Sequence, residues 1–292
     1  MTLLLVEAIL TGILTGGVYA LMASGLTIIY GVMNVINVAQ GILVILGAYL
    51  TYALEQSLHL DLFVSLLITM PSLFVLGAAI EWAALRRIKQ AGNSLAILVM
   101  FAVALLIEGV LSFIFGTDYV QLHAWYIEGS FKVGGFYIAY IYLFAFLLSV
   151  ALLFGLYVLV YRTKFGYGLR ASMQNPSAAL LVGIDVERIS TITFGIGVSL
   201  AAAGGVAFGA TNAFNPASSY DLISRLLVII VLGGMGSLQG AFLASLIMLI
   251  IGDITSVVWT PVWSSTVFFA FLIILLVVRP QGLFGQQIGR TQ

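Results

Sequence analysis

The sequence predicts an all-α polytopic membrane protein, and three observations indicate this class. Hydrophobic residues make up 62% of the 292 residues and charged residues only 8%, whereas soluble domains carry far more charge. The mean hydropathy is +1.18. Apolar runs approaching the roughly 20 residues that a spanning helix needs recur along the whole chain. We therefore expect a single transmembrane domain over residues 1–292, with about eight to nine spanning helices.

The candidate spans follow from the places where charged and turn-forming residues interrupt the apolar runs. They are residues 4–30, 38–54, 62–85, 95–115, 136–160, 191–212, 222–235, 239–257 and 262–278. The second and seventh are short for a full crossing. The glycine-rich phrase LGGMGSLQG separates the seventh from the eighth, so a re-entrant or discontinuous pair is an alternative to nine complete crossings.

The basic residues predict the orientation of the chain. Arg86, Arg87 and Lys89 share one loop, residues 162–188 hold several more, and Arg279 and Arg290 lie in the tail. By the positive-inside rule these regions face the cytoplasm. The expected N-terminus is then outside and the expected C-terminus cytoplasmic. The opening MTLLLVEAIL lacks the basic start of a secretory signal, so we interpret it as part of the first span.

Several kinds of chemistry have no visible residues in this sequence. The net charge is zero, so nothing favours a nucleic-acid partner. There are no cysteines, and the two histidines, His59 and His123, do not have the spacing of a metal site. The Gly-x-x-x-x-Gly-Lys-Ser/Thr loop that cradles the phosphates of ATP is also missing. We therefore expect no metal, no cofactor and no enzymatic activity of the chain itself.

A polar segment of about residues 162–189 separates two long apolar runs. Within it, Asn175 can cap a helix whose first position is taken by Pro176, and Gly183 is a natural stop. The pattern predicts about two turns of helix outside the bilayer, on the basic side. Either a partner docks on this helix or the segment is a plain ordered loop.

Polar residues also occur where the membrane makes them costly. Asn34, Asn37 and Gln40 lie three residues apart and would form one stripe on a helix. We interpret them as a discontinuous helix on a solute path; the alternative is a turn between two spans. Glu108 lies inside an apolar span and is a functional candidate by default. Its alternative role is a structural hydrogen bond to a neighbouring helix.

Glycine pairs predict close helix packing. Gly12 and Gly16, Gly205 and Gly209, and Gly236 and Gly240 have the Gly-x-x-x-Gly spacing that lets helix backbones approach each other.

Four phrases together resemble the LivH-type permeases of branched-chain amino-acid ABC importers. They are YGVMNVINVAQGILVILGAYL, GYGLRASMQNPSAALLVGIDV, IIVLGGMGSLQGAFLAS and RPQGLFG. The resemblance covers nearly the whole chain, and the second and third phrases are its specific parts. It implies a bacterial inner-membrane protein that works with a second, LivM-like permease, two cytoplasmic ATPases that bind the ATP, and a periplasmic binding protein. The solute stays open, because the family name also covers importers of urea, amides and other amino acids.

The resemblance places an ATPase-coupling segment on the polar segment described above. Its residues are Gly168, Leu169, Arg170, Ala171, Asn175, Pro176, Ala178, Ala179 and Gly183. Where many relatives have histidine, this chain has Gln40, which cannot titrate near neutral pH.

We expect alternating access that is powered by the partner ATPases. The residues predicted on the solute path are Asn34, Asn37, Gln40, Glu108, Gly234 and Gly236. The alternative is an ion-coupled secondary transporter in which Glu108 is the coupling group. An intramembrane enzyme is disfavoured, since no pair of catalytic carboxylates or His/Asp arrangement is placed at one depth.

Overall fold

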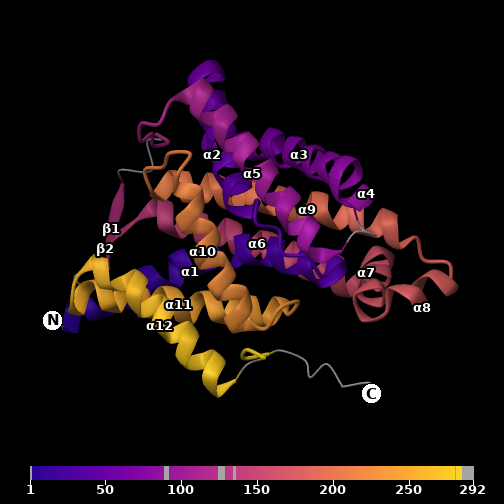
Figure 1. Cartoon of the computed structure of the whole chain (residues 1–292). Helices are drawn as coiled ribbons and strands as arrows, with labels where there is room; N and C mark the ends of the chain where they lie inside the picture. Colours follow the sequence, from indigo (N-terminus) through magenta and orange to yellow (C-terminus); the bar gives the residue numbers. More distant parts are fainter. Residues whose placement is uncertain (1, 89–91, 124–128, 134–135, 280, 285–292) are drawn as a thin grey trace.

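The computed structural model describes residues 2–88, 92–123, 129–133, 136–279 and 281–284, so Lys89 and Arg290 lie outside the described residues. The predicted all-α membrane fold is confirmed (Figure 1). The elements are α1 (Thr2–Met33), α2 (Gln40–Leu58), α3 (Leu62–Ile80), the π-helical turn η1 (Glu81–Leu85), α4 (Arg86–Ile88), α5 (Asn93–Phe115), β1 (Ser130–Val133), β2 (Phe136–Ala139), α6 (Tyr140–Arg162), α7 (Lys164–Gln174), α8 (Pro176–Leu181), α9 (Val186–Thr211), α10 (Ser218–Gly233), α11 (Leu238–Val258) and α12 (Pro261–Val278).

Eight helices of the described chain are long and apolar enough to cross a membrane. The expected span at 222–235 is not among them, because α10 has only 16 residues, about 24 Å of helix. The expected start of the fifth span at residue 136 is also wrong. Residues 136–139 form β2, which pairs antiparallel with β1 before α6 begins.

Contacts between loops show which loops lie at the same end of the bundle. At one end, which we call the basic end, Arg86 pairs with Glu187, and the Asn93 side-chain amide donates to the Asn34 carbonyl at 3.1 Å. At the opposite end, the His123 backbone amide donates to Glu55 at 3.2 Å, and Val120 pairs with Phe214. In Figure 1 the basic end is on the right, with α4, α7 and α8, and the hairpin is on the left.

Helix α9 forms the centre of the bundle and packs against α1, α2 and α3. Small residues allow this close packing. Gly205 lies directly against the Val44 carbonyl, and a Cβ atom added at Gly47 would lie 2.6 Å from the Cα of Ala202. A second seam joins α1 to α11, where Gly12 and Gly16 lie against Ile250 and Leu246. The first two glycine pairs are therefore packing positions, whereas the third is not a pair on one helix, because Gly236 lies between α10 and α11.

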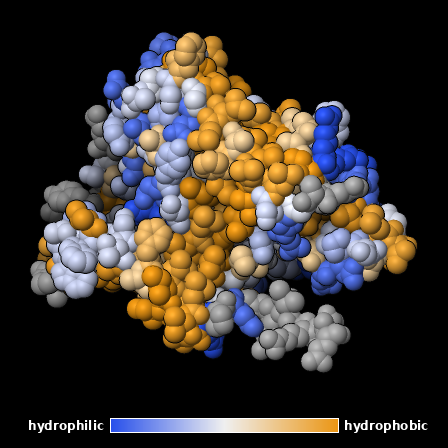
Figure 2. All heavy atoms as spheres, viewed as in Figure 1, coloured by the Kyte–Doolittle hydropathy of each residue, from blue (hydrophilic) through white to orange (hydrophobic). Residues whose placement is uncertain are grey.

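The outer helices present the apolar surface of the molecule. Most side chains of α5 and α12 are exposed or half-buried, and they are almost all hydrophobic. Figure 2 shows that apolar residues cover much of one face of the molecule. Such a surface fits surrounding lipid or another membrane subunit.

Candidate functional site

The polar segment after α6 folds into two capped helices at the basic end. Thr163 begins α7, where its hydroxyl accepts from the Gly166 amide at 3.1 Å. Asn175 begins α8, where its side-chain oxygen accepts from the Ala178 amide at 3.0 Å and Pro176 takes the first helical position. Gly183 has a positive φ of 83° and ends the turn after α8. The predicted start and stop of the short helix are confirmed.

The residues predicted for coupling divide into two groups within this segment. Two of those in α7 hold it on the bundle, since Gly168 lies against Ile189 and Leu169 is buried. The Ala171 carbonyl accepts from the Asn175 amide at 3.0 Å, where α7 ends. The Arg170 guanidinium lies over the rings of Tyr161 and Tyr167, with its carbon 5.2 and 5.0 Å from their centroids. The residues Asn175, Pro176, Ala178, Ala179 and Gly183 build α8 and its end. Sequence reasoning did not separate α7 as a helix of its own.

Helix α8 ends in an exposed apolar tip that sequence reasoning also missed. Ala179 is buried and accepts a hydrogen bond from the Ile184 amide at 3.0 Å, which fixes α8 against the chain that follows it. Leu181 is 89% exposed and Val182 75%, with Leu180 beside them. Figure 1 places α8 at the edge of the molecule, away from α12. Exposed apolar side chains at the tip of a capped helix form a surface on which a partner can dock.

The first break in the spans lies between α1 and α2. Asn34 has a positive φ of 51° and is exposed, whereas Asn37 and Gln40 are buried. The predicted stripe on one helix is therefore wrong, because residues 34–37 are not helical. The Asn37 amide donates to the Gln40 side-chain oxygen at 3.0 Å, and the Gln40 amide donates to the carbonyls of Met22 and Gly197 at 3.5 and 3.4 Å. This network joins the break to α1 and α9.

Gln40→Leu is expected to lower the free energy of unfolding by about 1–3 kcal/mol. The substitution shortens the side chain by one atom, leaves the buried Asn37 amide without its acceptor and removes two long hydrogen bonds to helix carbonyls of α1 and α9. Thermal unfolding of the purified protein in detergent measures the effect. Gln239→Leu is the matched control, since Gln239 is exposed. Equal shifts for the two variants would contradict the structural role of Gln40.

The second break lies between α10 and α11, as the glycine-rich phrase predicts. Gly234 and Gly236 have positive φ values of 93° and 88°. The chain after α12 packs here, because the Leu283 and Phe284 amides donate to the carbonyls of Leu232 and Gly233 at 2.7 and 3.2 Å. A Cβ atom added at Gly236 would lie 3.8 Å from the Cα of Gly31. The two breaks are thus neighbours at the basic end.

Glu108 lies away from the second break, at the other end of α10. Its carboxylate accepts a hydrogen bond from the Tyr220 hydroxyl at 2.6 Å, which joins α5 to the start of α10. The structure therefore shows the hydrogen bond to a neighbouring helix that was the alternative for this residue. The predicted path residues do not form one group. Asn34, Gly234 and Gly236 lie at the basic end. Asn37 and Gln40 bond to each other deeper in the bundle, where the adjoining Gly41 lies against Ser219 at the start of α10.

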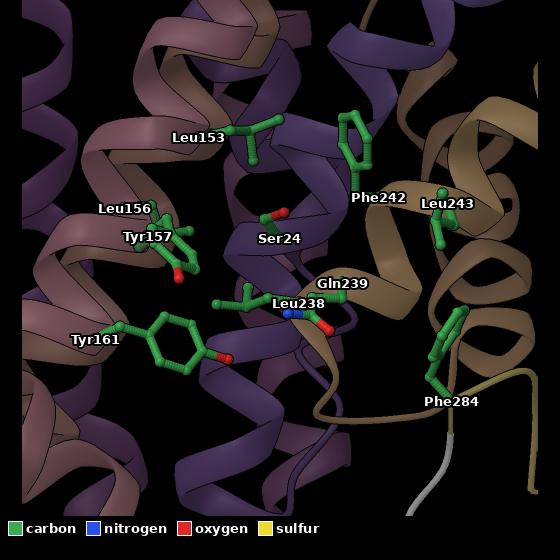
Figure 3. Close-up of a pocket in the computed structure, with 10 residues that line it drawn as sticks. All are labelled: Ser24, Leu153, Leu156, Tyr157, Tyr161, Leu238, Gln239, Phe242, Leu243 and Phe284. Atoms are coloured by element: carbon green, nitrogen blue, oxygen red, sulfur yellow. The ribbon is translucent and has the colours of Figure 1, made fainter.

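An apolar cavity of about 370 Å³ opens between α1, α6 and α11 (Figure 3). Ser24 lies at its back, Tyr157 and Tyr161 line one side, and Phe284 lines the other. The Ser24 hydroxyl has no hydrogen-bond partner among the described residues. No pattern in the sequence predicted this cavity, because its walls come from segments far apart in the chain. Within the described ranges, no cluster of His, Asp and Glu side chains is suited to hold a metal ion.

The fold combines a bundle of apolar helices, two neighbouring breaks in its spans and a capped helix outside it. These features define a multi-pass membrane protein of the transport class. Residues 8–277 match the family model described as the permease component of branched-chain amino acid transport systems, and the chain belongs to this family.

Curated relatives match nearly the full length of the chain. It is 27% identical to the high-affinity branched-chain amino acid transport permease LivH of Escherichia coli and 25% identical to BraD of Pseudomonas aeruginosa, with 96% of this chain and 95% of each relative covered. It is 32% identical to a probable LivH permease of Methanocaldococcus jannaschii, over 94% of this chain and 90% of the relative. No solved structure matches the chain.

Proposed function

We propose that this chain is the permease subunit of an ATP-driven importer and forms the translocation path for branched-chain or other amino acids. Its partners would be a second, LivM-like permease, two cytoplasmic ATPases that bind the ATP, and a periplasmic binding protein that delivers the solute. The chain would form one permease domain over residues 1–292 in the inner membrane, without a cofactor of its own. The basic residues Arg86, Arg162 and Arg188 favour a cytoplasmic basic end and a cytoplasmic C-terminus.

The exposed apolar tip of α8 is the observation that carries this proposal. A helix of six residues is too short to be stable alone, so its cap and the buried Ala179 are needed to hold it in place. Such a fixed helix can transmit a push or pull from a partner that grips Leu181 and Val182. The partner fits an ATPase, because the chain itself has no phosphate-binding loop.

Contacts inside the molecule provide a route from α8 to the two breaks. Helix α7 follows α6 directly and meets the end of α1, where Met173 lies against Gly31. Gly31 in turn neighbours Gly236 in the second break. A shift of α7 and α8 would therefore reach both breaks at once. ATP and the docked binding protein must favour different states for such a shift to drive transport.

Reconstitution in proteoliposomes tests the proposal. We expect uptake of labelled leucine, isoleucine or valine only when the chain is combined with its second permease, the ATPases, the binding protein and ATP. The purified chain alone is expected to give no uptake, with or without a proton or sodium gradient. Uptake by the chain alone, driven by an ion gradient, would overturn the proposal and favour the ion-coupled alternative.

Glu108→Gln separates the two mechanisms further. In an ATP-driven importer we expect the uptake rate to change less than about threefold, because the glutamine oxygen can still accept from Tyr220. An ion-coupled transporter would lose coupled uptake, since glutamine cannot carry a proton or balance a cation. Initial uptake rates in the full reconstituted system measure the difference. Complete loss of uptake with normal assembly would contradict the ATP-driven mechanism.

A further inference from the structure

Helices α5 and α10 present a polar strip on the otherwise apolar outside of the bundle. Tyr220 is 48% exposed and the Asp221 side chain 61% exposed, and the half-buried Ser224 follows one turn along α10. Glu108 approaches from α5 and accepts from the Tyr220 hydroxyl. We call these four residues the α5–α10 strip.

The strip reaches below the membrane surface. Glu108 is seven residues from the end of α5 at Phe115, which corresponds to about 10 Å along the helix. The residues of α5 between them include Val110, Phe113 and Ile114, whose exposed apolar side chains fit the membrane interior. A carboxylate at this depth normally faces protein or water, since hydrocarbon solvates it poorly. The strip is therefore not a lipid-facing surface.

Helix α5 is also poorly held by the rest of the chain. Of its 23 residues, only Ala96, Met100 and Leu111 are buried. Near its middle, the Glu108–Tyr220 hydrogen bond ties it to α10. Helix α12 is buried as little, so the polar side chains of the α5–α10 strip, and not the small buried surface alone, distinguish this face.

We propose that a second permease subunit, different in sequence from this chain, packs on the α5–α10 strip. This inference rests on the proposed function, which calls for two permeases. A second copy of this chain would fit poorly. In a twofold dimer the same patch meets itself, so the Glu108 carboxylates of the two copies would be brought toward each other. Arg225 balances Asp221, with which it pairs at 2.8 Å, so its charge is not available to Glu108. A different subunit can offer donors or cations instead.

Because the chain has no cysteine, single cysteines can report on this surface. Ser224→Cys and Ser112→Cys are conservative in size and probe α10 and α5, with Ser112 one turn from Glu108. Ile273→Cys is the matched control, on the exposed apolar side of α12, where Ile273 is 64% exposed. Each variant is expressed at native level in membranes of the source organism, spin-labelled, and measured for collision with oxygen, which concentrates in lipid.

We expect the labels at 224 and 112 to collide with oxygen at least threefold less often than the label at 273. A short thiol crosslinker should join the cysteines at 224 and 112 to a different permease, identified by mass spectrometry. Oxygen collision equal to that at 273, or a crosslink to a second copy of this chain, overturns the inference. Neither measurement depends on transport. A negative result in the labelling and crosslinking experiments therefore does not contradict the ATP-driven function. A negative uptake result does not contradict the assigned surface, which the labels test separately.

Discussion

Leu181→Glu is expected to reduce ATP-driven uptake at least tenfold while the chain still inserts in the membrane. The side chain makes little contact within the chain, being 89% exposed at the end of α8, so the fold has little to lose. If an ATPase binds this tip, the new glutamate would be buried without a partner. The free energy of that burial exceeds the free energy that corresponds to a tenfold change in uptake. Uptake, ATP hydrolysis and co-purification of the ATPase are measured on the same membranes.

Two further variants make this result specific. Leu181→Met keeps an apolar side chain of similar size and should retain at least half of the uptake. Ala178→Arg places a charge on the exposed side of α8 and should uncouple transport as Leu181→Glu does. Ala179→Arg is less informative, because Ala179 is buried and the change would dislodge α8 itself. Normal coupled uptake by both Leu181→Glu and Ala178→Arg would refute docking at this helix.

Gly205→Ala is expected to remove most of the folded protein. Gly205 lies against the Val44 carbonyl, and its added Cβ would also be 3.0 Å from the Ala48 amide. Both neighbours are backbone atoms of α2, so the two helices must separate to admit one methyl group. Overpacking of this kind costs about 3 kcal/mol or more when backbone has to move. Size-exclusion chromatography and thermal unfolding in detergent measure the loss.

Gly155→Ala is the matched control for this prediction. Gly155 is also inside a spanning helix, α6, but nothing outside its own helix lies within 4 Å of an added Cβ. The change should be neutral or stabilise the protein by up to about 1 kcal/mol, because alanine has the higher helix propensity. If both variants lost stability equally, a general intolerance to glycine replacement would explain the result and the close contact between α2 and α9 would not.

Local chemistry allowed much of the fold to be predicted. Hydropathy alone placed most spans, since each helix must satisfy its own backbone in lipid. The cap at Asn175, the proline after it and the stop at Gly183 act within a few residues, so α8 could be predicted before its surroundings were known. The positive-φ glycines, Gly234 and Gly236, likewise marked the second break.

The wrong predictions share one cause, namely contacts with residues that are distant in the sequence. Asn34, Asn37 and Gln40 have a helical spacing, but residues 34–37 form a break, and Gln40 after it is held by buried hydrogen bonds to Met22 and Gly197. Helix α6 begins later than expected, because residues 136–139 form β2 and pair with β1.

Hydropathy, caps and glycine torsions act over a few residues. They were therefore enough to predict that this protein spans the membrane, where its spans break and that a capped helix lies outside them. Which groups meet depends instead on tertiary packing. It brought Glu108 to Tyr220, set the two breaks beside each other and left Leu181 at the surface. Those outcomes depend on how helices pack across more than a hundred residues, and no local pattern encodes that.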